Sequence, residues 1–352
     1  MGIENRPVGV AVVGAGYWGQ NLVRNFAACE SSDLVVVADL SVERARKAVG
    51  SRSVRVTTDL SDVLDDPRVE AVAVATPVST HLPIGLACLE AGKHLLMEKP
   101  LAATLADARK LVEVAEANDL VLMCDHTFCY SSAVRKIREL VREGVVGEIQ
   151  YFDSIRINLG LIQQDCDVFW DLGPHDLSVL DFILPPTCRP TGVIAHAADP
   201  LGMGHPSVGY LTLPLSSGGI AHISLNWLSP TKIRTTIVGG SRRMLVWDDL
   251  DPHYQLRMYD KGVETRTELD DRQRREVLVS YRTGDMVAPA LELVEPLSRV
   301  AQELADSIRG HRQPATSGRA GLRVVTMLEA ARRSLKTGGA LVPLGGESDG
   351  DR

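Results

Sequence analysis

The sequence predicts an α/β fold in two parts, a doubly wound parallel sheet followed by a second part with a mostly antiparallel sheet. Three observations lead to this prediction. Short apolar runs alternate with helical segments as far as Asp125, at the spacing of repeated strand–helix–strand units. A glycine-rich loop follows the first apolar run directly. Beyond Asp125, apolar and polar residues alternate along several segments, which is typical of strands with one covered face. The length of 352 residues suits two domains.

The first part contains five predicted strands. Each is a short apolar run of the kind that suits a strand buried on both faces. The strands are Val8–Val13, Leu34–Asp39, Val69–Ala75, His94–Met97 and Val121–Cys124. Helices are predicted between them over Gln20–Cys29, Ser41–Val49, Ile84–Ala91 and Thr104–Asn118. Ser41 is a typical helix N-cap and Gly92 a typical helix end, so the local sequence supports two of these boundaries.

The second part mixes alternating strands with a few helices. The predicted strands are Ile149–Asn158, Ser207–Leu215, Ile220–Trp227, Thr235–Val238, Met244–Asp248 and Gln255–Tyr259. The predicted helices are Val134–Glu143, Asp171–Leu184, Leu297–Arg309 and Gly318–Lys336. The charged residues within 270–275 are predicted to form a solvated loop. We therefore expect one domain over residues 1–126, a second over 127–344 and a flexible tail over 345–352.

The composition argues against several classes of protein. The formal net charge is −7, which disfavours a nucleic-acid-binding protein held by a basic face. No apolar run approaches the roughly 18 residues of a membrane span, and the N-terminus lacks the architecture of a signal peptide. Six cysteines without a CxxC pair, together with dispersed histidines, support neither a disulfide framework nor a metal site. We expect a cytoplasmic protein without metal, nucleic-acid or membrane partners.

The glycine-rich loop predicts a dinucleotide cofactor. Gly14, Gly16 and Gly19 follow a predicted strand and precede a predicted helix, and Asp39 ends the next strand. In this context the glycines permit a tight turn, close approach of the backbone to a pyrophosphate, and close packing of helix on strand. Asp39 is predicted to accept hydrogen bonds from the ribose hydroxyls, and its charge would repel a 2′-phosphate. NAD is therefore favoured over NADP, although Arg44 weakens that preference.

Two further segments lie at the carboxyl ends of predicted strands. Thr76–Pro77 ends one strand and is followed by His81, and Glu98–Lys99–Pro100 ends the next strand. In a doubly wound sheet, the carboxyl ends of the strands face the ligand crevice. Lys99 is therefore predicted to point toward the cofactor, although a lysine by itself at such a place is more often a surface charge. Pro100 favours an extended conformation for the residue before it.

A third segment offers an acid–base pair. Asp171 and His175 are four residues apart at the start of a predicted helix, so they lie on one face of it. A carboxylate beside an imidazole fixes the tautomer of the ring and tunes its pKa, which suits a general base. The alternative is that Asp171 is the helix N-cap and His175 a structural histidine. The pair alone leaves both interpretations open.

Taken together, these motifs resemble one family. The loop over 14–19, Thr76–Pro77 with His81, the segment 98–100, and the pair Asp171 and His175 are similar to those of the glucose–fructose oxidoreductase, inositol dehydrogenase and MocA family. The resemblance covers nearly the whole chain. It implies an NAD-binding Rossmann domain followed by an α+β domain with a large, open, mostly antiparallel sheet. It also implies a homodimer or homotetramer, because that sheet packs against another subunit in the family.

The resemblance also implies roles for the matching residues. Lys99 would bind and polarise a sugar hydroxyl, His175 would be the general base and Asp171 would orient it, while the hydride passes to NAD. The expected cofactor-binding residues are Gly14, Gly16, Tyr17, Trp18, Gly19, Asp39, Thr76, Pro77, His81, Glu98, Lys99 and His126. The expected substrate-binding residues are Lys99, Tyr130, Arg156, Asn158, Asp171 and His175.

Three segments, 126–130, 156–160 and 167–176, look most similar to one branch of this family, the nucleotide-sugar 3-dehydrogenases. The resemblance implies oxidation of the C3 hydroxyl of a hexosyl unit, of UDP-glucose or UDP-N-acetylglucosamine type. The 3-keto product would then go to an aminotransferase. Residue usage rich in Ala, Arg, Val and Asp suggests a high-GC genome, in which related enzymes serve aminosugar and aminoglycoside antibiotic biosynthesis.

Other activities remain open. No motif in the sequence identifies a binding pocket for UDP. A glucosyl unit of an assembled aminoglycoside could therefore be oxidised at C3″ instead. Inositol or another cyclitol is a further candidate substrate. An NAD-dependent glycosidase would use a transient C3 oxidation and release free sugar without net NADH. A non-catalytic NAD(H)-sensing protein would need neither Lys99 nor the pair of Asp171 and His175.

Overall fold

A computed structural model describes residues 6–160, 162–163, 166–265 and 279–345. The chain divides into two compact units. The first consists of residues 1–131, 177–182 and 293–329, and the second of residues 132–176, 183–292 and 330–352. The charged segment 270–275 lies outside the described residues, as does the predicted tail apart from Gly345. The expected domain boundary at residue 126 stays a prediction.

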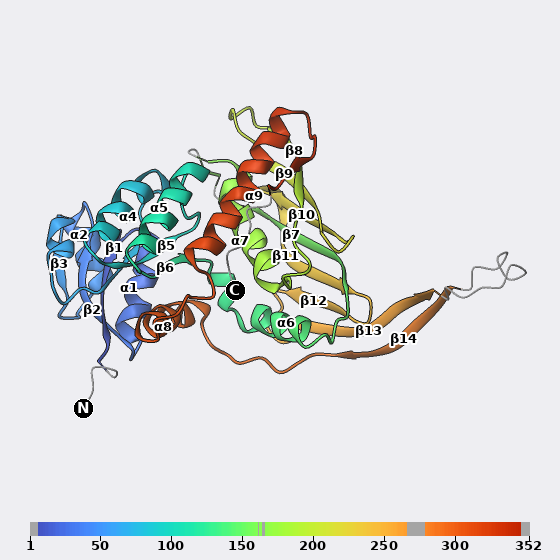
Figure 1. Cartoon of the computed structure of the whole chain (residues 1–352), viewed down its shortest axis with the longest axis horizontal. Coiled ribbons are helices and arrows are strands. Elements are labelled where there is room, and N and C mark those ends of the chain that lie inside the picture. Colours follow the sequence, from blue (N-terminus) through green and yellow to red (C-terminus); the bar gives the residue numbers. More distant parts are fainter. Residues whose placement is uncertain (1–5, 161, 164–165, 266–278, 346–352) are drawn as a thin grey trace, which may run out of the picture. The chain divides into compact units, whose positions relative to one another are not determined.

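The first unit is built on a six-stranded parallel sheet (Figure 1). Its strands are β1 (Val8–Val13), β2 (Ser32–Ala38), β3 (Arg55–Thr57), β4 (Ala71–Val74), β5 (His94–Glu98) and β6 (Leu122–Asp125). Their order is β3-β2-β1-β4-β5-β6, so the chain reverses its direction of travel between β1 and β4. Such a switch point opens a crevice at the carboxyl ends of the strands. The predicted doubly wound sheet is confirmed.

The helices of this unit follow the sequence signals closely. They are α1 (Gly19–Ala28), α2 (Val42–Val49), α3 (Ser61–Leu64), α4 (His81–Glu90), α5 (Leu105–Ala117) and α8 (Pro296–Arg309), with 3₁₀ turns η2 (Val78–Thr80) and η3 (Thr127–Tyr130). Ser41 caps α2 by accepting the Arg44 N–H, as its sequence position predicts. Thr104 caps α5 in the same way, through the Asp107 N–H.

Helix α8 completes the core of the first unit although it lies far along the chain. It contacts α1, and its buried residues Val300 and Leu304 join the same apolar cluster as Phe26. Arg24 of α1 pairs with Glu295, the residue before α8, at 2.6 Å. Burial of these apolar side chains contributes several kcal/mol at about 25 cal/mol per Å² of apolar surface, so α8 fixes the carboxyl-terminal half of α1.

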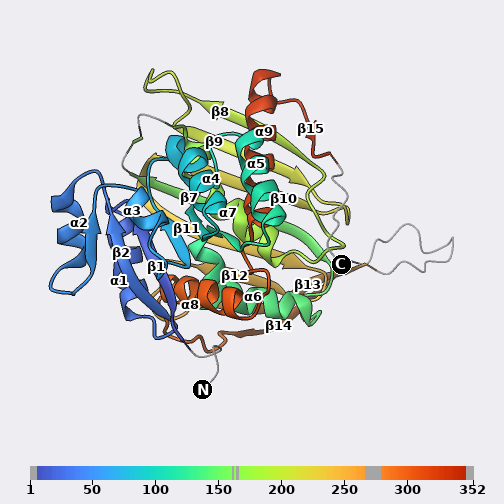
Figure 2. The same ribbon diagram turned by 60° about the vertical axis from the view of Figure 1, so that its left-hand side comes forward.

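The second unit is built on a nine-stranded sheet (Figure 2). Its strands are β7 (Ile149–Leu159), β8 (Gly192–Ala198), β9 (Val208–Pro214), β10 (Ile220–Asn226), β11 (Leu228–Gly240), β12 (Met244–Asp248), β13 (Leu256–Thr265), β14 (Val279–Val287) and β15 (Val342–Pro343). Their order is β14-β13-β12-β11-β7-β10-β9-β8-β15. Among the described pairings only β7 and β10 run parallel, so the predicted, mostly antiparallel sheet is confirmed.

The strands β9 and β10 alternate between buried and more exposed residues, as strands with one covered face do. Helix α6 (Ser132–Arg142) contacts β12. Helix α7 (Val168–Ile183) has residues in both units, as does α9 (Gly318–Lys336). Across the described residues, no helix is both long and apolar enough to cross a membrane.

Candidate functional site

The glycine loop has the shape that a dinucleotide requires. Gly14 has φ +94°, and a Cβ there would lie 2.6 Å from the carbonyl oxygen of Ala75. A Cβ on Gly19 would overlap the carbonyl oxygen of Gly14, so both positions are closed to a side chain. Gly16 differs, because a Cβ there would meet no described atom within 4 Å. The open space at Gly16, just before the amino end of α1, fits a cofactor pyrophosphate held by backbone N–H groups.

Asp39 directly follows β2, and it bonds to this loop. Its Oδ2 accepts the Ala15 N–H at 2.8 Å, its Oδ1 accepts the Ser41 N–H at 2.7 Å, and Arg44 pairs with it at 2.8 Å. Burial raises the pKa of Asp39, but the two backbone donors and Arg44 together hold the pKa below its usual value. The group is therefore a carboxylate at neutral pH. Arg44, which the sequence placed nearby, compensates part of that charge.

His81 hydrogen-bonds to the backbone that follows β4 and to the backbone that follows β5. Its Nδ1 lies 3.0 Å from the carbonyl oxygen of Pro100, and its Nε2 lies 3.0 Å from that of Thr76. The ring is 1% exposed, and burial lowers its pKa. Thr76 also bonds the hydroxyl of Thr80 at 2.7 Å. His81 thus holds the backbone after β4 against the backbone after β5, next to Lys99.

The carboxyl ends of β5 and β6 bring charged groups together. Glu98 of β5 and Asp125 of β6 are register partners, and Lys99 follows Glu98 directly. Asp125 accepts the indole N–H of Trp18 at 2.8 Å, so the glycine loop is bonded to the end of β6. The sequence interpretation missed Asp125. The available signal was an acid that ends a buried strand, one residue before His126.

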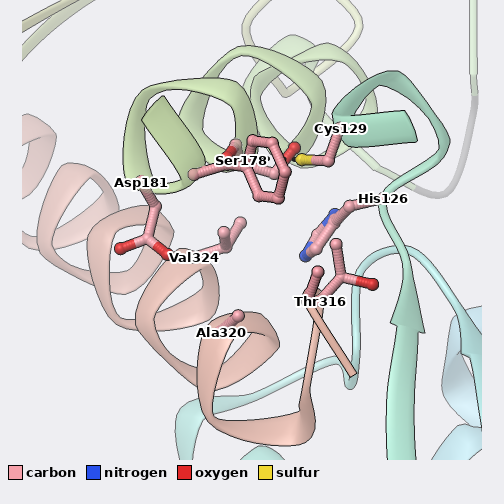
Figure 3. A pocket seen from close by; sticks show the side chains of 9 residues that line it. His126, Cys129, Ser178, Asp181, Thr316, Ala320 and Val324 are labelled. Atoms are coloured by element: carbon pink, nitrogen blue, oxygen red, sulfur yellow. Dashed lines mark hydrogen bonds between the residues drawn. The ribbon is translucent and has the colours of Figure 1, made fainter. Parts of the chain in front are cut away.

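Figure 3 shows the surroundings of His126. The ring points into a cavity of about 10 Å³, roughly the space of one water molecule, with Ala320 and Val324 of α9 opposite. Both ring nitrogens lack a hydrogen-bond partner among the described residues. Burial lowers the pKa of His126 to about 4, so the ring is neutral at pH 7.

Tyr130, predicted to bind substrate, is 2% exposed. Its hydroxyl lies 3.1 Å from the Thr316 hydroxyl, which itself donates to the carbonyl of Cys124 at 2.7 Å. Burial raises the pKa of this phenol well above its usual range. The ring is therefore part of the interior of the first unit, and its contact with substrate stays a prediction.

In the second unit, helix α7 begins three residues earlier than predicted, at Val168. Asp167 caps it, because its Oδ1 accepts the N–H groups of Phe169 and Trp170 at 2.9 and 3.0 Å. The alternative in which Asp171 is the N-cap is therefore wrong. Asp171 lies inside the helix, one turn before His175, as the spacing of the pair predicts.

Trp227 provides a partner for Asp171 that the sequence did not reveal. Its indole N–H donates to Asp171 Oδ2 at 3.2 Å, and its ring is 1% exposed. His205 approaches that ring edge-on, with the centroids 6.2 Å apart. An indole N–H on one carboxylate oxygen restricts the rotation of Asp171. This contact therefore fixes the orientation of the Asp171 carboxylate on the face of α7 that carries His175.

Arg156 and Asn158 lie on β7. Arg156 is 4% exposed and gives two hydrogen bonds to Asp176, at 2.6 and 3.2 Å, while Ser154 donates to the same carboxylate at 2.7 Å. Breaking such a buried ion pair costs about 3–5 kcal/mol, so Arg156 anchors α7 on the sheet. Its contact with substrate stays a prediction. Asn158 is half-buried, two residues further along the strand.

The predicted residues therefore gather in two places, one in each unit. Lys99 and the cofactor residues lie in the first unit, and Arg156, Asn158, Asp171 and His175 lie in the second. Tyr17 is 90% exposed beside Gly16. Within the described ranges, no group of three or more His, Cys, Asp or Glu side chains is arranged to hold a metal ion.

Two family models match this chain. Residues 8–126 match the NAD-binding Rossmann fold of the GFO/IDH/MocA oxidoreductase family. Residues 138–344 match the C-terminal α/β domain of the same family. The two matches together span most of the sequence, and each coincides with one of the two sheets.

The first curated relatives of this chain are oxidoreductases that match it over part of their length. Myo-inositol 2-dehydrogenase of Thermotoga maritima is 26% identical over 181 residues, which are 50% of this chain and 54% of that protein. The chain spans about half the length of the first curated relatives that it matches.

Two solved structures share the fold. UDP-N-acetylglucosamine 3-dehydrogenase GnnA of Acidithiobacillus ferrooxidans has a TM-score of 0.78 and 23% identity, over 93% of this chain and 97% of that one. GenD2 from gentamicin A biosynthesis, in complex with NAD, has a TM-score of 0.79 and 24% identity, over 97% of both chains. At these identities the likeness concerns the fold.

Proposed function

The chain belongs to the GFO/IDH/MocA oxidoreductase family, and from this premise we propose that it oxidises the C3 hydroxyl of a UDP-linked hexose to a ketone with NAD. The observation that carries the proposal is the combination of three features. A glycine loop open at Gly16 lies in the same unit as Lys99 at a strand end, and an acid–base pair lies on one face of α7. A hydride-transfer enzyme needs all three elements.

Each residue has a proposed chemical role. Bound NAD would accept the hydride from the sugar carbon. Lys99, as an ammonium, stabilises the alkoxide that develops on the sugar oxygen. His175 takes the hydroxyl proton, and Asp171, held by Trp227, fixes the orientation and tautomer of the ring. Asn158 is the best placed of the remaining predicted substrate residues, because it is half-buried on β7 near Arg156.

The proposed substrate is of UDP-glucose or UDP-N-acetylglucosamine type. The fold similarity to the UDP-N-acetylglucosamine 3-dehydrogenase GnnA supports this choice. We propose that the 3-keto product is consumed by an aminotransferase, because a ketone is the group that transamination requires. A second candidate is oxidation of a glucosyl unit already joined to an aminoglycoside. The similarity to GenD2 from gentamicin A biosynthesis supports that candidate.

The charge of Asp39 should decide between NAD and NADP. Asp39→Asn removes the charge and keeps the shape of the side chain, although its single acceptor oxygen can serve only one of the Ala15 and Ser41 N–H groups. We expect the preference for NAD over NADP to fall about 10-fold, the effect of losing roughly 1.4 kcal/mol of charge repulsion. Kd values for both cofactors, from titration of tryptophan fluorescence, measure the ratio. Asp33→Asn, an exposed acid on the same strand, is the control. An unchanged ratio in Asp39→Asn would contradict this role.

Mass spectrometry of products tests the proposed activity. The protein with NAD is incubated separately with UDP-glucose, UDP-N-acetylglucosamine, myo-inositol and a glucosylated aminoglycoside, each with a ketoacid as a hydride acceptor. Loss of two hydrogens from a UDP-hexose, with the ketone at C3, is the expected result. The same loss only from the aminoglycoside favours the second candidate. Oxidation of inositol alone, or release of free sugar without oxidation, would overturn the proposal.

A further inference from the structure

The ends of β5 and β6 place two carboxyl groups side by side in the interior of the first unit. Glu98 and Asp125 are partners in the parallel ladder, so their side chains leave the sheet on the same face, and each carboxyl group is close enough to shift the pKa of the other. Two carboxylates have only acceptor oxygens, so a hydrogen bond between them requires a proton on one member. A proton on one of these two acids therefore turns the repulsion between neighbouring carboxylates into a hydrogen bond.

The contacts of the two acids differ, and the difference indicates which one carries the proton. Asp125 is 1% exposed and accepts the Trp18 indole N–H at 2.8 Å and the Thr127 hydroxyl at 2.7 Å. These donors favour its charged form. The carboxyl group of Glu98 is near one donor, the backbone N–H of Lys99. Its Oε2 is buried without a partner among the described residues. A neutral carboxyl tolerates that environment better than a carboxylate does.

The neighbouring titratable groups agree with this assignment. Burial and the adjacent Asp125 raise the pKa of Glu98 well above its usual value, and the Lys99 ammonium only partly opposes them. Burial also raises the pKa of Asp125, while Trp18 and Thr127 act in the opposite direction. Cys124, the residue before Asp125, is a neutral thiol at pH 7, because burial raises its pKa well above the usual range. His126, which follows Asp125, is neutral as described above.

We propose that Glu98 is a positioning residue that stays protonated at neutral pH and donates a hydrogen bond to the Asp125 carboxylate. The pair then holds one negative charge in place of two. That charge fixes the indole of Trp18 in the glycine loop, and the Glu98 hydrogen bond fixes the strand end from which Lys99 extends. The proton of Glu98 is not exchanged during the reaction. Where turnover is concerned, this inference rests on the proposed function.

Infrared spectroscopy tests the protonation state without any substrate. We expect the wild-type protein at neutral pH to show a C=O stretching band of a protonated carboxyl that is absent from Glu98→Gln. Glu116→Gln, which changes a more exposed acid on α5 in the same unit, is the control and should keep the band. A carboxyl band that Glu98→Gln leaves intact overturns the proposal. If Glu98→Gln does not fold, neutron diffraction of the wild type decides, since a deuterium must then lie on Glu98.

Paired substitutions test the positioning role. Glu98→Gln retains a neutral donor to Asp125, and we expect kcat/KM to fall only about 3-fold, the cost of a weaker hydrogen bond. Glu98→Leu leaves Asp125 without that donor, and we expect a fall of about 100-fold and weaker NAD binding. The pH profile of kcat/KM should keep its shape in Glu98→Gln.

Equal losses in the two variants, or the disappearance of one limb of the profile in Glu98→Gln, would show that Glu98 works as a carboxylate. Both results would overturn the inference. A wild-type protein that oxidises none of the sugars contradicts the proposed function instead. The infrared band and the Kd for NAD would still decide the state of Glu98.

Discussion

Replacing Lys99 with alanine is expected to lower kcat for sugar oxidation about 10³-fold, since a preorganised charge on a developing oxyanion is worth roughly that factor. Binding of NAD should remain within a small factor, because the proposed contacts of the cofactor with the glycine-loop backbone and with Asp39 do not involve this side chain. Steady-state kinetics and NAD titration measure the two effects separately.

Lys110→Ala is the matched control for Lys99→Ala. Lys110 is an exposed lysine on α5 in the same unit, and its loss should change neither quantity. Near-native turnover of Lys99→Ala would show that this lysine is a surface charge, the alternative that the sequence left open. A loss of NAD binding as large as the loss of kcat would assign Lys99 to the cofactor instead of the reacting hydroxyl.

Replacing His175 with alanine is expected to lower kcat about 10²–10⁴-fold, the range that a general base contributes. The effect should appear in kcat more than in KM, because the proton is transferred only in the chemical step. Stopped-flow measurement of NADH formation in a single turnover isolates that step. His222→Ala on β10, which removes an exposed histidine of the second unit, should react at the wild-type rate.

Combining Lys99→Ala with His175→Ala asks whether the two groups serve one step. If both act on the same hydroxyl, the double variant should lose little more than the more damaged single variant, as groups that work as a unit do. Losses that multiply across the two single variants would place the lysine and the histidine in independent steps. A structural role for His175 would instead appear as a lower unfolding midpoint in His175→Ala.

Most of the first unit could be predicted from the sequence because its signals are local. An uninterrupted apolar run such as Val8–Val13 has few alternatives to a buried strand, and a glycine loop follows it at once. The three-residue strand β3 carries too few residues to show a pattern. In the second unit, Gly284 and Asp285 interrupt the β-prone residues of β14, and β8 contains three alanines, so both strands have a weaker sequence signal.

The candidate site was predictable only to the extent that its residues lie in motifs. The spacing of Asp171 and His175 sufficed to place them one turn apart on a helix. Their partners could not be predicted this way, because the Trp227 indole reaches Asp171 from 56 residues away in the chain. Trp18 and Asp125 are 107 residues apart. Such contacts depend on how the strands pair, which no short stretch of sequence encodes.

The three glycines of the loop are required for different reasons. Gly14 and Gly19 are closed to any side chain by neighbouring backbone, so the fold itself would be damaged by their replacement. A side chain at Gly16 would meet no described atom, and at this position we propose that it would collide with the bound cofactor. In a descendant that no longer bound the dinucleotide, selection would no longer maintain glycine at position 16. That position would therefore accept other residues before positions 14 and 19 do. Gly14 and Gly19 would be conserved because the fold requires them. A related sequence that keeps both of these glycines but has lost Gly16 is therefore expected to have lost binding of the cofactor.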